Sequence, residues 1–61
     1  MSSREFYLEK LKSHQYLINA YMEELKTSPD KKILINHFIY DEIIEKQNTI
    51  QRLKDLQEED E

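Results

Sequence analysis

The chain has 61 residues, a formal net charge of −4 and no cysteine, which excludes disulfides and thiolate metal sites. So short a chain buries little apolar surface on its own, and self-association is the remedy that remains. Its apolar runs fall short of the roughly 20 residues that a membrane span needs, and its start lacks the apolar core of a secretion signal. We therefore expect a cytoplasmic protein with no membrane partner.

The charged residues form no basic stripe. Binding to a phosphate backbone normally needs such a stripe, so we expect no direct nucleic-acid binding. The negative excess lies in the acidic end of the sequence, at Glu58, Glu59, Asp60 and Glu61. We expect this acidic surface to be a solvated end, with contact to a basic partner as the alternative.

The sequence predicts two long helices, at about residues 3–26 and 29–56, in one all-α domain spanning residues 1–61. Glycine is absent and there is one proline, so few positions allow a sharp turn. Ser2 and Glu5 have the spacing of a capping box, which marks the start of the first helix. The first helix then carries a heptad stripe, made of Tyr7, Leu11, His14, Ile18, Tyr21 and Leu25.

A short connection around Pro29 separates the two helices. Because a residue before proline avoids the helical region, Ser28 should end the first helix and cap the second. Such a short connection makes the helices antiparallel, so that residue i faces roughly residue 55 − i. The acidic end opposes the helix dipole, and we expect the second helix to fray after about Gln57.

Both helices carry more apolar surface than one partner helix can cover. The wide apolar zones are residues 16–22 and 33–40, which the antiparallel register sets side by side near the turn. After Ile44 only a narrow stripe continues, interrupted by Lys46 and Gln47. The second helix should therefore change from being covered on several sides to lying against one partner.

We predict that this surface pairs two hairpins into a four-helix bundle, a homodimer, or that it binds a different protein. Tyrosine suits an interface because it combines a large apolar area with a polar tip, although a small core would also place tyrosines at its rim. Tyr16 lies off the heptad stripe and is the best candidate for a partner contact. The predicted interface residues are Tyr16, Leu17, Tyr21, Leu34, Phe38, Ile39 and Tyr40.

Two histidines are the only candidates for metal or pH chemistry. His14 falls in the apolar stripe, where we expect a packed ring bonded to Glu42 or Asp41 rather than a metal ligand or a pH switch. His37 and Asp41 share a helix face at a spacing of four residues, and we expect a local pair rather than a metal site completed by His14. We predict no metal and no cofactor.

The residues form no recognisable catalytic set. The first helix holds one isolated serine, Ser13, and the chain has no glycine loop that could hold a phosphate. The prediction from the residues is a protein that is not an enzyme.

The run His14-Gln15-Tyr16-Leu17-Ile18, followed by Glu24-Leu25, resembles the AbbA-type antirepressors of spore-forming bacteria. The resemblance implies a small helical dimer that presents acidic groups to the DNA-binding surface of a transition-state repressor. A second comparison is with the hairpin aspartyl-phosphate phosphatases of sporulation. It aligns their helical motif with residues 37–41 and makes Asp41 the acting carboxylate.

The leading hypothesis is a non-enzymatic regulator that binds and inhibits or modulates a protein partner through its apolar, tyrosine-rich surface. The first alternative is an antirepressor that mimics DNA, and the second is a phosphatase-like hairpin that acts through Asp41.

Overall fold

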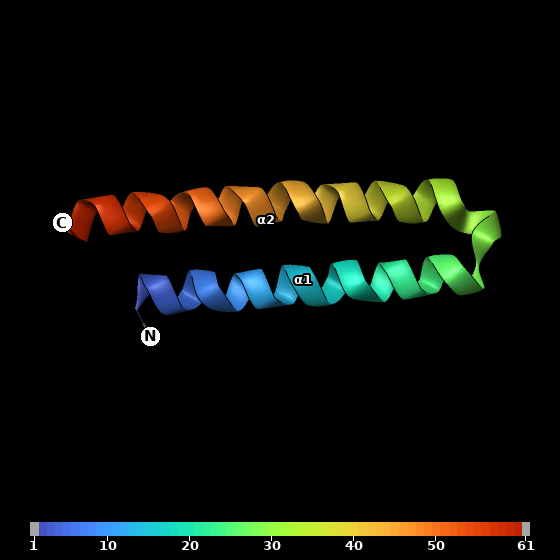
Figure 1. Cartoon of the computed structure of the whole chain (residues 1–61), viewed down its shortest axis with the longest axis horizontal. Coiled ribbons are helices and arrows are strands. Elements are labelled where there is room, and N and C mark those ends of the chain that lie inside the picture. The colour runs from blue at the N-terminus through green and yellow to red at the C-terminus, as the bar shows by residue number, and fades with distance from the viewer. Residues whose placement is uncertain (1, 61) are drawn as a thin grey trace.

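The protein is a hairpin of two antiparallel helices. The computed structural model describes the backbone of residues 2–60 and the side chains of residues 2–57. Over those residues the chain forms α1 (Ser3–Thr27), a 3-10 turn η1 (Pro29–Lys31) and α2 (Lys32–Asp60), with no strand. The helices lie side by side in a rod of 49 × 18 × 11 Å, and α2 runs past the start of α1 (Figure 1). The predicted all-α hairpin is confirmed.

Both ends of α1 are closed by local hydrogen bonds. The backbone N–H of Glu5 donates to the Ser2 hydroxyl over 3.2 Å, which confirms Ser2 as the N-cap. At the other end, the N–H of Ser28 donates to the Glu24 carbonyl over 2.8 Å. The Thr27 hydroxyl donates to the same carbonyl over 3.1 Å. These bonds satisfy backbone groups that have no partner within the helix.

The connection differs from the predicted one at the start of α2. Ser28 makes no side-chain cap bond, and the α-helix begins at Lys32 instead of Pro29. The reason is a tight turn, in which the N–H of Lys31 donates to the Ser28 carbonyl over 3.0 Å. That bond spans three residues and sets a 3-10 geometry before the α-helical bonding begins.

The predicted end of α2 at residue 56 is also wrong. The helix continues to Asp60, while fraying from about residue 57 stays a prediction. Glutamate and glutamine are good helix formers. Their propensity favours the helix here, although acidic side chains interact unfavourably with the C-terminal end of the helix dipole.

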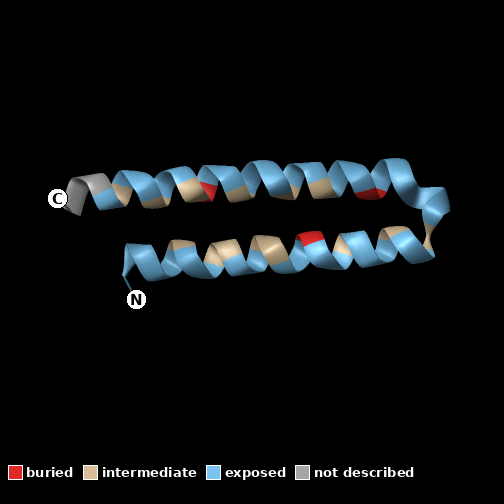
Figure 2. Cartoon of the chain, in the orientation of Figure 1, coloured by how far each residue is buried: buried red, intermediate tan, exposed pale blue. Residues whose placement is uncertain are grey.

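A heptad seam joins the two helices, and the buried and half-buried residues lie on their facing sides (Figure 2). The seam of α1 is the predicted stripe of six residues. The seam of α2 follows the same alternation of four and three residues, through Ile35, Ile39, Glu42, Lys46, Thr49, Leu53 and Leu56. The buried apolar side chains among those described are Ile18, 7% exposed, and Ile35, 3% exposed. The core is therefore a narrow line.

Two of the contacts between the helices depart from the predicted register. Tyr21 stacks on Phe38 with ring centroids 5.6 Å apart, where the prediction sets residue 34 opposite Tyr21. Gln15 bonds to Lys46, where the prediction sets residue 40. His14, in contrast, bonds to Glu42, one residue from the predicted position 41, so these contacts depart from the predicted register by one to six residues.

Candidate protein-interaction surface

The most apolar stretch of the chain lies largely outside the seam. Within residues 33–44, Ile35 is buried, whereas Ile33 is 89% exposed, Tyr40 63% and Leu34 53%. The middle of the α2 seam is instead polar, with Glu42, Lys46 and Thr49 facing α1. The prediction that a lone hairpin leaves apolar surface uncovered is thus supported by the observed exposure.

Four of the predicted interface residues gather on one side of the hairpin, which we call the aromatic face: Leu17, Tyr21, Leu34 and Phe38. The stacked rings of Tyr21 and Phe38 form its centre, and their planes are inclined by 29°. Leu17 precedes Tyr21 by four residues and Leu34 precedes Phe38 by four, so each leucine lies one turn from its ring on the same helix face. Leu34 and Phe38 are both exposed.

The other three predicted residues lie elsewhere. Ile39 is half-buried in the seam. Tyr16 is two positions from the buried Ile18, so it points away from α2, and it is 73% exposed. Tyr40 is five positions from the buried Ile35 and points away from α1. The seven predicted residues are therefore divided among the seam and several outer sides of the hairpin.

The acidic residues expected as a second surface fall at the end of the chain. Glu58, Glu59 and Asp60 belong to α2, but their side chains lie outside the described residues, and so does Glu61.

A polar layer crosses the middle of the seam. His14 Nδ1 donates to Glu42 Oε2 over 2.7 Å, and the two side chains are 14% and 21% exposed. Lys46 Nζ donates to Gln15 Oε1 over 2.6 Å. The predicted packed histidine bonded to Glu42 is confirmed. The role of Lys46 was missed, because the sequence pattern presents it as an interruption of a stripe through Ile43, which lies outside the seam and is 38% exposed.

His37 and Asp41 form the predicted local pair, with His37 Nε2 and Asp41 Oδ2 3.5 Å apart on the exposed side of α2. His14 is engaged with Glu42 instead. Among the described residues, no group of three or more histidine, aspartate and glutamate side chains could hold a metal ion. The ring of His14 keeps one buried nitrogen, Nε2, that has no hydrogen-bond partner.

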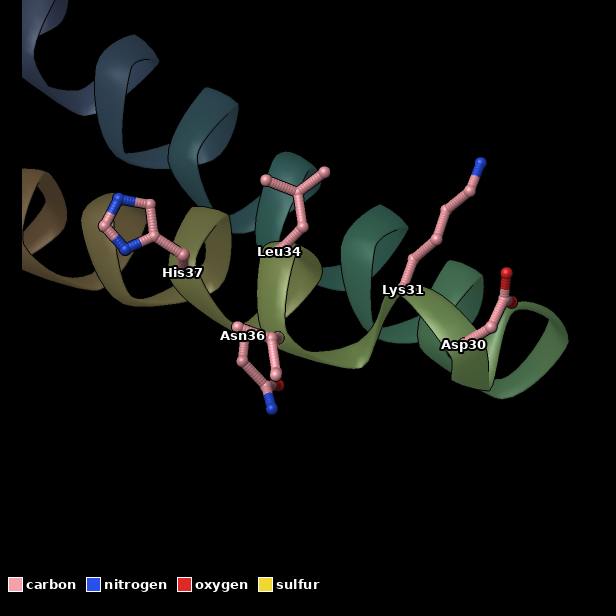
Figure 3. Close-up of a pocket in the computed structure, with 6 residues that line it drawn as sticks. Asp30, Lys31, Leu34, Asn36 and His37 are labelled. Carbon is pink, nitrogen blue, oxygen red and sulfur yellow. The ribbon is translucent and has the colours of Figure 1, made fainter.

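A surface hollow lies at the start of α2, beside Asp30, Lys31, Ile33, Leu34, Asn36 and His37. Figure 3 shows Lys31 and Leu34 projecting to one side of the helix and Asn36 to the other. The polar groups of a small-molecule site converge on a common point. The polar groups around this hollow do not. The hollow is part of the exposed surface at the start of α2.

Over the part of the chain that the structure describes, neither helix combines the length and the apolar character needed to cross a membrane. Comparison with protein-family models, with curated proteins and with solved structures finds no match to this chain. The resemblance to the antirepressors therefore stays a prediction.

Proposed function

We propose that the protein is a small non-enzymatic regulator that binds another protein through the aromatic face of a dimeric, four-helix assembly. The observation that carries the proposal is the stacked pair of Tyr21 and Phe38 beside the exposed Leu34. Aromatic side chains are enriched in protein interfaces, and a few such anchors usually supply most of the binding energy.

Acidic side chains border the aromatic face and define the chemistry of the partner. Glu24 lies three residues after Tyr21, and Asp41 lies three residues after Phe38, so each carboxylate is on the same helix side as its ring. Glu45 follows one turn after Asp41. The fitting partner has an apolar groove with a basic rim, because such a rim complements these carboxylates.

The acidic border also supports the second candidate, an antirepressor that occupies the basic DNA-binding surface of a regulator. The two candidates differ in which contacts provide the affinity. A DNA mimic depends on charge, and its binding weakens steeply as salt is added. A regulator anchored by Tyr21 and Phe38 is nearly indifferent to salt.

The test is affinity capture from the native host, followed by titration of the purified partner. Phe38→Ala should weaken binding roughly 30-fold or more, the loss typical of an interface anchor. Tyr16→Ala is the control, because Tyr16 is well exposed but lies away from the aromatic face. Equal binding by wild type and Phe38→Ala, with helicity retained, would overturn the proposal.

Asp41 allows the enzymatic alternative to be tested in the same preparation. A phosphatase-like hairpin would lose activity on an aspartyl-phosphate protein in Asp41→Asn. The proposal expects no such activity in the wild-type protein.

A further inference from the structure

A second heptad stripe runs along α2 beside the hairpin seam. We call it the uncharged stripe, and its residues are Ile33, Asn36, Tyr40, Ile43, Gln47 and Ile50. The spacing alternates three and four residues, as a helix-pairing seam does. All of its members are exposed apart from Ile50, which is half-buried. Three isoleucines and a tyrosine therefore form a pairing pattern without a partner helix.

The direction of the stripe fits a four-helix bundle. From Asn36 onward each member directly follows a seam residue, as Asn36 follows Ile35 and Tyr40 follows Ile39. One residue rotates an α-helix by about 100°, so the stripe is turned by about that angle from the seam. In a four-helix bundle each helix packs against two neighbours at nearly a right angle around its axis.

The hairpin exposes more surface than a compact monomer of its mass. The accessible surface is 5052 Å². A compact monomer of 7.5 kDa exposes about 4,200 Å² on the usual scaling of surface with mass. The excess is roughly 800 Å², which is of the same order as the area that each partner contributes to a standard protein interface.

We infer that a second copy of the chain packs its α2 antiparallel against the uncharged stripe, and this rests on the dimer in the proposed function. The order along the stripe is a palindrome: apolar, amide, apolar, apolar, amide, apolar. Antiparallel pairing about its centre sets Ile33 against Ile50 of the second copy and Asn36 against Gln47 of the second copy. Tyr40 then meets Ile43 of the second copy. Each apolar residue faces an apolar one, and the amides can donate and accept hydrogen bonds between them.

Charge complementarity favours the antiparallel arrangement over the parallel one. The next position along the stripe after Ile50 is Lys54. In the antiparallel register Lys54 faces Pro29 of the second copy, next to Asp30, whereas a parallel pair sets the two copies of Lys54 against each other. Opposite charges across an interface select the register, and like charges disfavour it.

The uncharged stripe and the aromatic face occupy different sides of α2. Tyr40 follows the seam residue Ile39, whereas Phe38 precedes it, so the two are rotated from the seam in opposite directions. A second copy on the stripe thus leaves the Tyr21 and Phe38 rings accessible to a protein partner.

Single-cysteine cross-linking tests the arrangement cleanly, because the chain has no cysteine of its own. Asn36→Cys and Gln47→Cys proteins are oxidised separately and as a mixture. The mixture should give a disulfide-linked dimer of one chain of each kind. Neither protein alone should, because two copies of position 36 would stand about 16 Å apart along the helices, beyond the reach of a disulfide. Cross-linking of each protein with itself would indicate parallel pairing and overturn the inference.

Sedimentation of two matched variants tests which face of α2 forms the dimer. Tyr40→Glu places a charge on the stripe and should weaken the dimer roughly 30-fold or more. Leu34→Glu places the same charge on the aromatic face of the same helix, at a residue of similar exposure, and should leave the dimer intact. A wild-type monomer at micromolar concentration, or a dimer lost only in Leu34→Glu, would overturn the inference. Loss of partner capture in Leu34→Glu with the dimer retained would separate the two proposals.

Discussion

The bond between His14 and Glu42 allows a quantitative test of the seam. The His14 ring is only 14% exposed, its Nδ1 donates to Glu42, and its Nε2 is buried without a partner. Glu42→Leu would leave both ring nitrogens without a partner inside the seam. A hydrogen bond to a charged acceptor contributes roughly 1.5–3 kcal/mol. A chain of this size has a total stability of roughly 3–9 kcal/mol, so this one substitution should remove a large share of it.

The reverse substitution should cost less. In His14→Leu the Glu42 carboxylate keeps its partial exposure, 21%, and can turn toward water. The double variant with leucine at both positions replaces the pair by an apolar contact between seam residues. Replacing both partners of a buried polar pair by apolar groups is often neutral or stabilising. We therefore expect the double variant to be at least as stable as the wild type.

The assay is urea unfolding of the four proteins, followed by far-ultraviolet circular dichroism at one fixed protein concentration. A fixed concentration is needed because any association also contributes to the midpoint. The expected order of midpoints, from low to high, is Glu42→Leu, His14→Leu, wild type and the double variant. A Glu42→Leu midpoint equal to that of the wild type would refute the energetic role of the pair. A double variant no more stable than Glu42→Leu would refute the argument that leucine suits this layer.

Three further predictions concern the helices. Ile35→Ala should lower the free energy of unfolding by about 2–5 kcal/mol, because Ile35 is buried, whereas Tyr16→Ala should change it by less than about 0.5 kcal/mol; equal effects in urea unfolding would contradict the described core. Ser2→Ala removes the cap on the Glu5 N–H and should cost about 1 kcal/mol, with faster amide exchange confined to the first turn of α1. Thr49→Val should leave the unfolding midpoint unchanged or raised, because the Thr49 hydroxyl donates to a carbonyl of its own helix over 2.9 Å.

The sequence was sufficient for the elements of the fold. Ser2 marks the start of α1 through the chemistry of a cap, and Pro29 marks the break between the helices through its missing N–H. Both effects act within a few residues. The heptad of α1 likewise predicts its inner side, including His14 opposite Glu42. These features depend on local spacing, which a sequence displays directly.

The register and the inner side of α2 were harder to predict. The spacing of apolar residues does not reveal the 3-10 turn between the helices. Tyr21 and Gln15 contact residues several positions from those predicted, whereas His14 contacts Glu42, one position away. For α2, hydrophobicity points to residues 33–44, but the helix turns Lys46 and Glu42 inward instead. The alternating spacing of four and three residues that starts at Ile35 identifies the seam of α2. The pattern is recognised only when polar residues are accepted as seam members.

The predicted interface residues lie on different sides of the hairpin for the same reason. Large apolar residues such as Tyr16, Phe38 and Tyr40 are close in sequence or in the predicted pairing. Their directions around the helix axis nevertheless differ. A list of interface residues based on residue type thus combines side chains from several sides of the hairpin. They can be assigned to separate sides only when it is known which side of each helix faces the other helix.

The distribution of residues on α2 connects stability with assembly. Its inner seam contains Glu42 and Lys46, which bond to α1 and select one alignment of the hairpin, yet bury little apolar area. Its outer side contains Ile33, Tyr40 and Ile43, which provide apolar area that the hairpin leaves exposed. The intramolecular seam is therefore suited to specificity, and the outer stripe is suited to stabilisation. Since burying the outer stripe requires another chain, we expect folding of the hairpin and its association to be energetically coupled.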